Sequence, residues 1–261
     1  MNVQTRQVSV ALLALTVSVA ACSHKRARKS QAAFDQLPHV FFWAWERPED
    51  LQFLDPQRFG VAFLAQTLTL ENEKVVLRPR RQPLHVNPQA KLIAVTRVES
   101  QKVTGKRAAL SAEQRKQITD LVLKTLSLDR VAAVQIDFDA ASTERSFYSS
   151  LLNDLRAQLP QAVPLSITAL ASFCIGDRWL DDLPVDEAVP MIFRMGADDQ
   201  PIKNTLAAGN DFREPLCRHS YGIALDEPFE MKFDESRRLY LFADHAWTQK
   251  DLALLPGGYG K

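Results

Sequence analysis

The sequence has few glycines, and their spacing excludes the common nucleotide sites. Nine of its 261 residues are glycine, and none form a G-x-G-x-x-G fingerprint or a P-loop. Both motifs need glycine because the backbone must approach a phosphate closely. No cofactor is therefore predicted. Internal repeats and low-complexity segments are also lacking, which excludes a solenoid of repeated units.

An excess of charge of either sign is lacking too. The chain has 32 Lys and Arg residues against 31 Asp and Glu residues, a formal net charge of +1. Because nucleic-acid-binding domains concentrate positive charge on one face, no nucleic-acid partner is expected. The length allows one large domain or two small ones.

Long apolar runs are missing except at the N-terminus. Residues 8–20 form an apolar stretch of signal-peptide length, too short to span a bilayer comfortably. The stretch leads into Val19-Ala20-Ala21-Cys22, which resembles the bacterial lipobox, whose cysteine is acylated and becomes the mature N-terminus. An ordinary secretory signal with an incidental cysteine is the alternative. We predict a lipoprotein signal peptide over residues 1–21 and lipidation of Cys22.

The segment after this cysteine predicts attachment to a membrane. Residues 22–36 are rich in Lys and Arg and are expected to form a lipid-anchored tether, either solvated or lying along anionic head groups. Ser23, where some lipoproteins carry Asp, resembles the sorting signal for the outer membrane. The expected location is the bacterial cell envelope, at the outer membrane facing the periplasm. Residues 37–261 are predicted to form a single domain.

Two cysteines remain for that domain, Cys174 and Cys217. An even pair in an oxidising compartment predicts a disulfide, and two separate buried thiols are the alternative. Neither lies in a C-x-x-C or histidine-rich setting, so no metal site is expected.

Eight short apolar runs follow one another along the chain, at residues 40–45, 59–70, 92–98, 131–139, 165–171, 188–195, 221–225 and 239–243. Such runs are typical of parallel strands that are buried on both faces. Helical patterns separate several of them, which predicts an α/β fold, a (β/α)8 TIM-like barrel with some helices shortened or missing. An open doubly wound sheet is the alternative.

Local signals place the helices. Ser111 and Gln114 form a capping-box pattern that opens a helix over residues 112–126. Ser142 or Thr143 is expected to cap a second helix over residues 144–159, and a shorter helix is expected over 203–208. Residues 75–84 are expected to pair with 67–70 as a hairpin.

One strand ends in two acids. Gln135, Asp137 and Asp139 alternate with apolar residues, so they share one face of the strand. Same-face neighbours lie about 6.6 Å apart, so both acids can reach one ligand. In a barrel the chemistry lies at the C-terminal ends of the strands, which predicts a site here.

Other polar and aromatic residues lie at the ends of the other predicted strands: Trp45, Glu46, Arg97, Glu99, Arg194, Asp226 and Asp244. Carboxylates, arginines and tryptophans around one cleft are typical of carbohydrate sites. The structural alternatives are an ion pair of Arg194 with Asp137 or Asp139, and tryptophans that pack in the core or at the rim.

Three segments, residues 135–139, 164–171 and 185–196, resemble an uncharacterised bacterial family, domain of unknown function 3142. The resemblance implies a barrel similar to glycoside hydrolases. The strand with Asp137 and Asp139 also resembles the fourth strand of family-18 chitinases. Those enzymes need a Glu two residues after the last Asp, where this chain has Ala141, so chitinase chemistry is not carried over.

Two functions are predicted for the barrel, with a carbohydrate ligand and a membrane as partners. The first is hydrolysis of a polysaccharide, with Asp137 and Asp139 as nucleophile or stabiliser. Its candidate proton donors are Glu46, Glu99 and Asp226. The second is binding of a glycan without hydrolysis, and a structural envelope lipoprotein is a further alternative. The candidate substrate-binding residues are Trp45, Arg97, Gln135, Arg194, Asp226 and Asp244.

Overall fold

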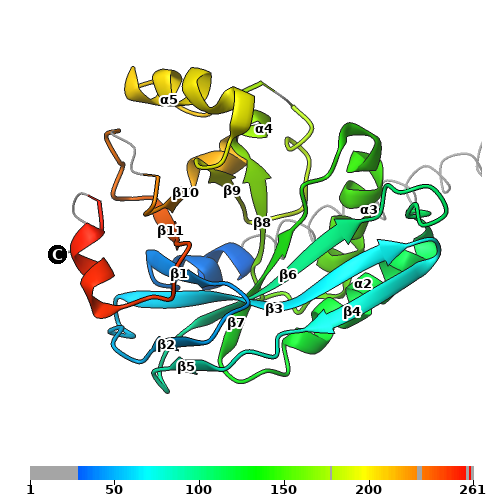
Figure 1. The fold of residues 1–261 in the computed structure, drawn as a ribbon, viewed down its shortest axis with the longest axis horizontal. Helices are drawn as coiled ribbons and strands as arrows, with labels where there is room; N and C mark the ends of the chain where they lie inside the picture. Colours follow the sequence, from blue (N-terminus) through cyan, green and yellow to red (C-terminus); the bar gives the residue numbers. More distant parts are fainter. Residues whose placement is uncertain (1–28, 177, 228–230, 257–258, 260–261) are drawn as a thin grey trace, which may run out of the picture.

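In the computed structural model, which describes residues 29–176, 178–227, 231–256 and 259, the chain forms a closed barrel of eight parallel strands (Figure 1). The strands are β1 (Val40–Ala44), β3 (Phe59–Glu71), β6 (Leu92–Ser100), β7 (Val131–Asp137), β8 (Leu165–Leu170), β9 (Glu187–Met191), β10 (Ser220–Ala224) and β11 (Arg238–Phe242). Strand β1 pairs with both β3 and β11, which closes the barrel. Each strand coincides with one apolar run, so the predicted (β/α)8 fold is confirmed.

The helices around the barrel are unequal in length. They are α2 (Ala112–Thr125), α3 (Arg145–Gln158), α4 (Ala171–Gly176) and α5 (Asp199–Ala207), with 3-10 turns η1 (Ser142–Glu144), η2 (Gly196–Asp198), η3 (Pro215–Arg218) and η4 (Gln249–Leu254). Helices α2 and α3 pack side by side on one flank (Figure 1). The described helices that follow later strands are shorter, as the sequence predicts.

The two long helices begin differently. The capping box of Ser111 and Gln114 at the start of α2 is confirmed. The expected cap of the next helix is wrong, because Ser142 and Thr143 lie in η1 and the helix starts at Arg145. Instead the buried Glu144 accepts a hydrogen bond from the backbone N–H of Ala141 at 2.7 Å. A carboxylate therefore satisfies a free backbone donor ahead of the helix.

A hairpin extends the barrel wall beside one part of its mouth. Strand β4 (Lys74–Pro79) pairs antiparallel with the last six residues of β3, which confirms the predicted hairpin. The loop after β6 is fixed to this hairpin, because Gln101 N donates to Leu70 O at 2.9 Å and Ala109 N donates to Asn72 O at 2.8 Å. Outside the barrel, β2 (Glu49–Leu51) and β5 (Leu84–Val86) form a small parallel pair.

The interior of the barrel is filled by side chains. The rings of Phe41 and Tyr240 stack with their centroids 5.5 Å apart. Gly60 must be glycine, because a Cβ there would lie 2.3 Å from the ring of Phe41. The described part of the barrel is thus a packed core rather than a pore, which leaves its C-terminal end as the place for a site.

The N-terminal end of the barrel is closed by a segment that the sequence assigns to the tether. Residues 29–35 are helical, and Phe34 is buried there. The guanidinium of Arg238 lies 4.0 Å from the centroid of the Phe34 ring and donates to the Phe34 carbonyl at 2.9 Å. The folded body therefore begins earlier than the predicted boundary at residue 37. The signal peptide and Cys22 lie outside the described residues.

Within the described ranges, no helix has the length and apolar character that a bilayer span requires. The structure contains the disulfide between Cys174 in α4 and Cys217 in η3, which lie 43 residues apart in the sequence. It connects the segment after β8 with the segment before β10, so it fixes two loops on one side of the barrel.

Replacing Cys174 and Cys217 by serine should lower the free energy of unfolding by about 4 kcal/mol, because the unfolded chain regains the entropy that the disulfide-closed loop had lost. Guanidinium titration with and without a thiol reductant measures this loss. Reductant should shift the midpoint of the natural protein towards that of the double variant and leave the variant unchanged. A reductant effect of the same size on both proteins would contradict the prediction.

Candidate functional site

A cavity of about 520 Å³ opens at the C-terminal ends of the strands. Its lining residues are Trp43, Trp45, Arg47, Arg97, Asp137, Asp139, Leu170, Met191, Phe193, Arg194, Ala224, Asp226, Phe242, Ala243 and Asp244. Seven of the residues predicted for the site are among them: Trp45, Arg97, Asp137, Asp139, Arg194, Asp226 and Asp244. The barrel thus brings together residues that are nearly 200 positions apart in the sequence.

Asp137 ends β7 and is the most constrained acid of the cavity. Its side chain is buried, and its two oxygens accept hydrogen bonds from Thr168 Oγ1 at 2.8 Å and from Arg97 Nη1 at 3.3 Å. Burial raises the pKa of Asp137 to about 6, although Arg97 and the Thr168 hydrogen bond lower it; the charges of Asp139 and Glu99 add to the rise. The carboxyl group therefore keeps a proton for part of the time near neutral pH.

Asp139 has the opposite environment. It lies two residues beyond Asp137, after the end of the strand, and is exposed. It makes no hydrogen bond or ion pair with any residue that the structure describes. Two carboxyl groups thus line one cavity, one of them buried and tethered and the other solvated and free to contact a ligand.

Arg97 on β6 connects the acids to the aromatic residues. It pairs with Glu99 at 2.9 Å and with Asp137 at 3.3 Å, and its guanidinium lies 5.2 Å from the centroid of the Trp45 ring. Burial lowers the pKa of Arg97, but the carboxylates of Asp137, Glu99 and Asp139 outweigh burial and raise it. Arg97 is therefore a fixed cation that holds Asp137 in place.

One wall of the cavity is aromatic. Trp43 stacks on Trp45 with the ring centroids 4.9 Å apart, and the centroids of the Trp43 and Phe242 rings are 4.8 Å apart. The Phe242 ring in turn packs against Phe193, with the ring centroids 4.7 Å apart. Phe193 and Phe242 were not among the site residues predicted from the sequence. The signal that could have found them is spacing, because each lies two residues after an inward-facing residue of its strand. Their continuous row of rings gives the cavity an apolar surface of fixed shape.

Gln135 supports this wall from below. It is buried inside the barrel and is not among the residues that line the cavity. Its side chain accepts from Trp43 Nε1 at 3.1 Å and donates to Ser166 Oγ at 3.0 Å. Ser166 and the Tyr240 hydroxyl both donate to the buried Glu187. The predicted substrate-binding role of Gln135 is therefore replaced by a role in orienting Trp43.

The rim of the cavity also carries Arg194 and Asp226. Arg194 is exposed and pairs with Asp226 at 3.4 Å, and its backbone N–H donates to the Glu227 carboxylate at 3.0 Å. The structural alternative of an ion pair between Arg194 and Asp137 or Asp139 is therefore wrong, and Arg97 is the partner of Asp137. The reason is register, because Arg97 and Asp137 lie opposite each other on paired strands.

Asp244 and Arg47 complete the rim. Asp244 contacts His245 Nδ1 at 3.0 Å, and this contact lowers the pKa of Asp244. Arg47 lines the cavity, but its guanidinium donates to the carbonyls of Asp244 and Ala243 at 2.6 and 2.5 Å and to buried Glu49 at 2.8 Å. Arg47 therefore shapes the rim by holding its loops together.

The three predicted proton donors are poorly placed or already paired. Glu46 does not line the cavity and pairs with Arg78 at 3.5 Å. Glu99 also lies outside this cavity and pairs with Arg97, while Asp226 lines it but pairs with Arg194. Asp137, by contrast, combines access to the cavity with a raised pKa.

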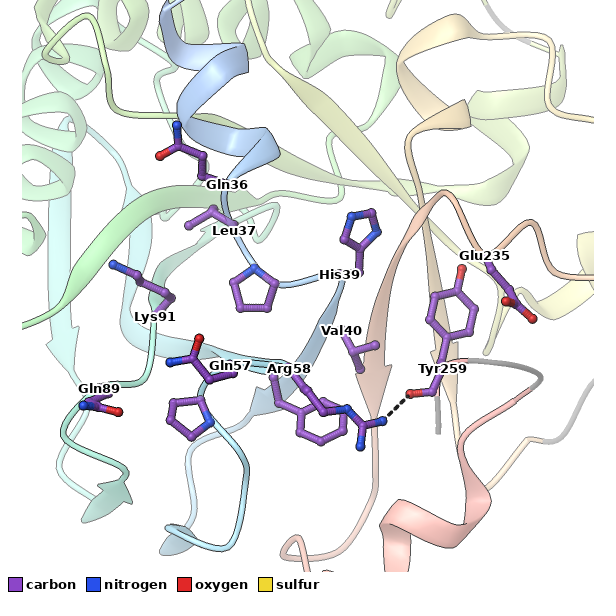
Figure 2. Close-up of a pocket in the computed structure, with 13 residues that line it drawn as sticks. Gln36, Leu37, His39, Val40, Gln57, Arg58, Gln89, Lys91, Glu235 and Tyr259 are labelled. Atoms are coloured by element: carbon purple, nitrogen blue, oxygen red, sulfur yellow. Dashed lines mark hydrogen bonds between the residues drawn. The ribbon is translucent and has the colours of Figure 1, made fainter. Parts of the chain in front are cut away.

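A second large hollow, of about 480 Å³, lies at the N-terminal ends of the strands (Figure 2). Its polar side chains do not converge on one point. Figure 2 shows Lys91 and Gln36 directed away from Arg58, which donates to the Tyr259 carbonyl at 3.5 Å. The described residues also contain no group of three His, Cys, Asp or Glu side chains that could hold a metal ion. The chemistry is therefore concentrated at the mouth.

Three comparisons with known proteins gave different results. No curated protein matches the chain. Among solved structures it is similar to the spore cortex-lytic enzyme SleL of Bacillus cereus, with 16% sequence identity and a TM-score of 0.46 over 71% of this chain and 51% of that one. The chain thus spans about half the length of that enzyme. A family model described as a domain of unknown function, DUF3142, matches residues 59–189, and the chain belongs to this family.

Proposed function

We propose that the barrel mouth is a carbohydrate site at which Asp137 and Asp139 act together on a glycosidic bond. The observation that carries this proposal is the contrast between two acids that line one cavity, one buried with a pKa of about 6 and one exposed. Two carboxyl groups in contrasting environments are the usual basis of acid and base roles in glycosidases.

The environments assign the roles. Asp137 is the general acid, in place of the nucleophile or stabiliser role predicted from the sequence, because its raised pKa lets it carry a proton to the leaving oxygen near neutral pH. Asp139, exposed and unpaired among the described residues, is the carboxylate that acts as nucleophile or base. Thr168 and Arg97 are positioning residues, since each holds one oxygen of Asp137.

The aromatic wall supports a sugar as the ligand. The apolar faces of sugar rings pack on aromatic side chains, and their hydroxyl groups need polar partners at the edges. Phe193 and Phe242 supply the aromatic surface. Asp226, Asp244 and Arg194 around the rim supply the polar partners for the hydroxyl groups.

Glycan binding without hydrolysis is a second candidate function. Two observations favour it. Ala141 stands where family-18 chitinases need a glutamate, and Arg97 already pairs with Asp137. Both functions use the same cavity, so they differ only in whether Asp137 transfers its proton.

We also propose that the protein is a lipid-anchored envelope protein, at the outer membrane facing the periplasm. The lipobox-like segment ending in Cys22 supports the anchor. The disulfide between Cys174 and Cys217 supports an oxidising compartment.

Asp137→Asn and Asp139→Asn should each lower the rate of polysaccharide hydrolysis by about 100-fold or more, because each removes an acid–base group. Release of reducing ends from a panel of envelope and extracellular polysaccharides measures the rate. Asp129→Asn, an exposed acid just before the N-terminal end of β7 and so at the other end of that strand from the mouth, is the matched control and should keep full activity. Equal rates in all three variants would remove the two acids from the site, and binding without any hydrolysis would favour the second function.

The rate should fall as pH rises through about 6, because Asp137 then loses the proton that it must donate. Thr168→Val removes a hydrogen bond that lowers the pKa of Asp137, so the fall should move to higher pH. Carbon-13 NMR titration of the aspartate carboxyl groups reports the same pKa independently of turnover. A Thr168→Val profile that stays in place or moves to lower pH would contradict the assignment.

Cys22→Ser should abolish incorporation of labelled palmitate and move the protein from the membrane fraction to the soluble fraction of the producing bacterium. The double variant of Cys174 and Cys217 should retain labelling, since the folded domain is not the acceptor. Labelling that persists in Cys22→Ser would refute the anchor.

A further inference from the structure

Asp137 and Asp139 border a second, smaller hollow. Its volume is about 160 Å³, and its lining residues are Arg97, Val98, Glu99, Ser100, Lys102, Asp137, Phe138 and Asp139. Three of these, Arg97, Asp137 and Asp139, also line the large aromatic cavity. The two acids therefore stand at the junction of two hollows rather than at the bottom of one.

The walls of the small hollow are held in place by the fold. They consist of the end of β6 and the residues that follow β7. Ser100 Oγ donates to the buried Glu144, and Lys102 Nζ lies 3.8 Å from the same carboxylate. Because Glu144 is the residue directly before α3, the hollow is tied to the start of a long helix of the barrel.

The two hollows differ in chemistry. The large cavity has an aromatic wall, whereas the small one is edged by Glu99, Ser100 and Lys102. A single sugar against the aromatic wall would leave the small hollow empty. A chain of two or more sugars would fill both and would carry its linkage past Asp137 and Asp139.

We propose that the ligand is an oligosaccharide chain that crosses the acid pair, with one unit in the aromatic cavity and the next unit in the small polar hollow. This inference rests on the proposed function and names its substrate class, a glycan of at least two units bound across an inter-sugar linkage.

Three tryptophan substitutions distinguish the contributions of the two hollows to ligand binding. Lys102→Trp fills the small hollow, and Leu170→Trp narrows the large cavity only. Lys106→Trp is the matched control, because Lys106 lies in the same loop and its side chain is 61% exposed against 65% for Lys102, but it lines neither hollow. The probes are the mono-, di- and tetrasaccharides of glucose, N-acetylglucosamine, glucosamine and galacturonic acid, with affinity measured by titration calorimetry.

The natural protein should bind the disaccharide of at least one series about tenfold or more tightly than its monosaccharide. Lys102→Trp should remove this gain and leave monosaccharide binding unchanged, Leu170→Trp should weaken both, and Lys106→Trp should change neither. Equal affinity for mono- and tetrasaccharides, or equal behaviour of Lys102→Trp and Lys106→Trp, would overturn the two-hollow inference while leaving the carbohydrate site standing. Failure of the natural protein to bind any probe would overturn the proposed function itself, and this inference with it.

Discussion

The site depends on the burial of one carboxyl group, that of Asp137. A cation 3.3 Å away would normally favour the charged form of an acid, yet the pKa of Asp137 is raised to about 6. Burial prevails because Arg97 divides its charge between Asp137 and Glu99 and is about one-third exposed, so solvent weakens its field. The loss of water around the Asp137 carboxylate, in contrast, raises its pKa in full, because no other group shares that effect.

The barrel produces this environment through its register. Arg97 and Asp137 lie opposite each other on β6 and β7, and Thr168 reaches Asp137 from β8. Three adjacent strands thus supply one acid and its two partners at the same height. The strand ends one residue before Phe138, so Asp139 leaves the ladder and meets solvent. The difference between the two acids follows from where β7 stops.

Much of the architecture could be predicted from the sequence, because burial on both faces gives each barrel strand an apolar run. The alternation of Gln135, Asp137 and Asp139 also placed the acids at the mouth. Partners across strands could not be predicted in this way, since a period of two residues does not reveal the register of neighbouring strands. Arg97 rather than Arg194 pairs with Asp137 for this reason, and depth along the strand puts Gln135 in the core.

The glutamate that family-18 chitinases place after this strand has no substitute nearby in the chain. Ala141 occupies its position, and Glu144, the next acid, is buried and committed to the Ala141 backbone and to Ser100. In the proposed hydrolysis, Asp137 on the strand itself takes the place of that glutamate. Asp137 has the burial and the raised pKa for that task, which a solvated acid on the rim would lack. The same burial that makes Asp137 costly to ionise is what would make it useful to a departing sugar oxygen.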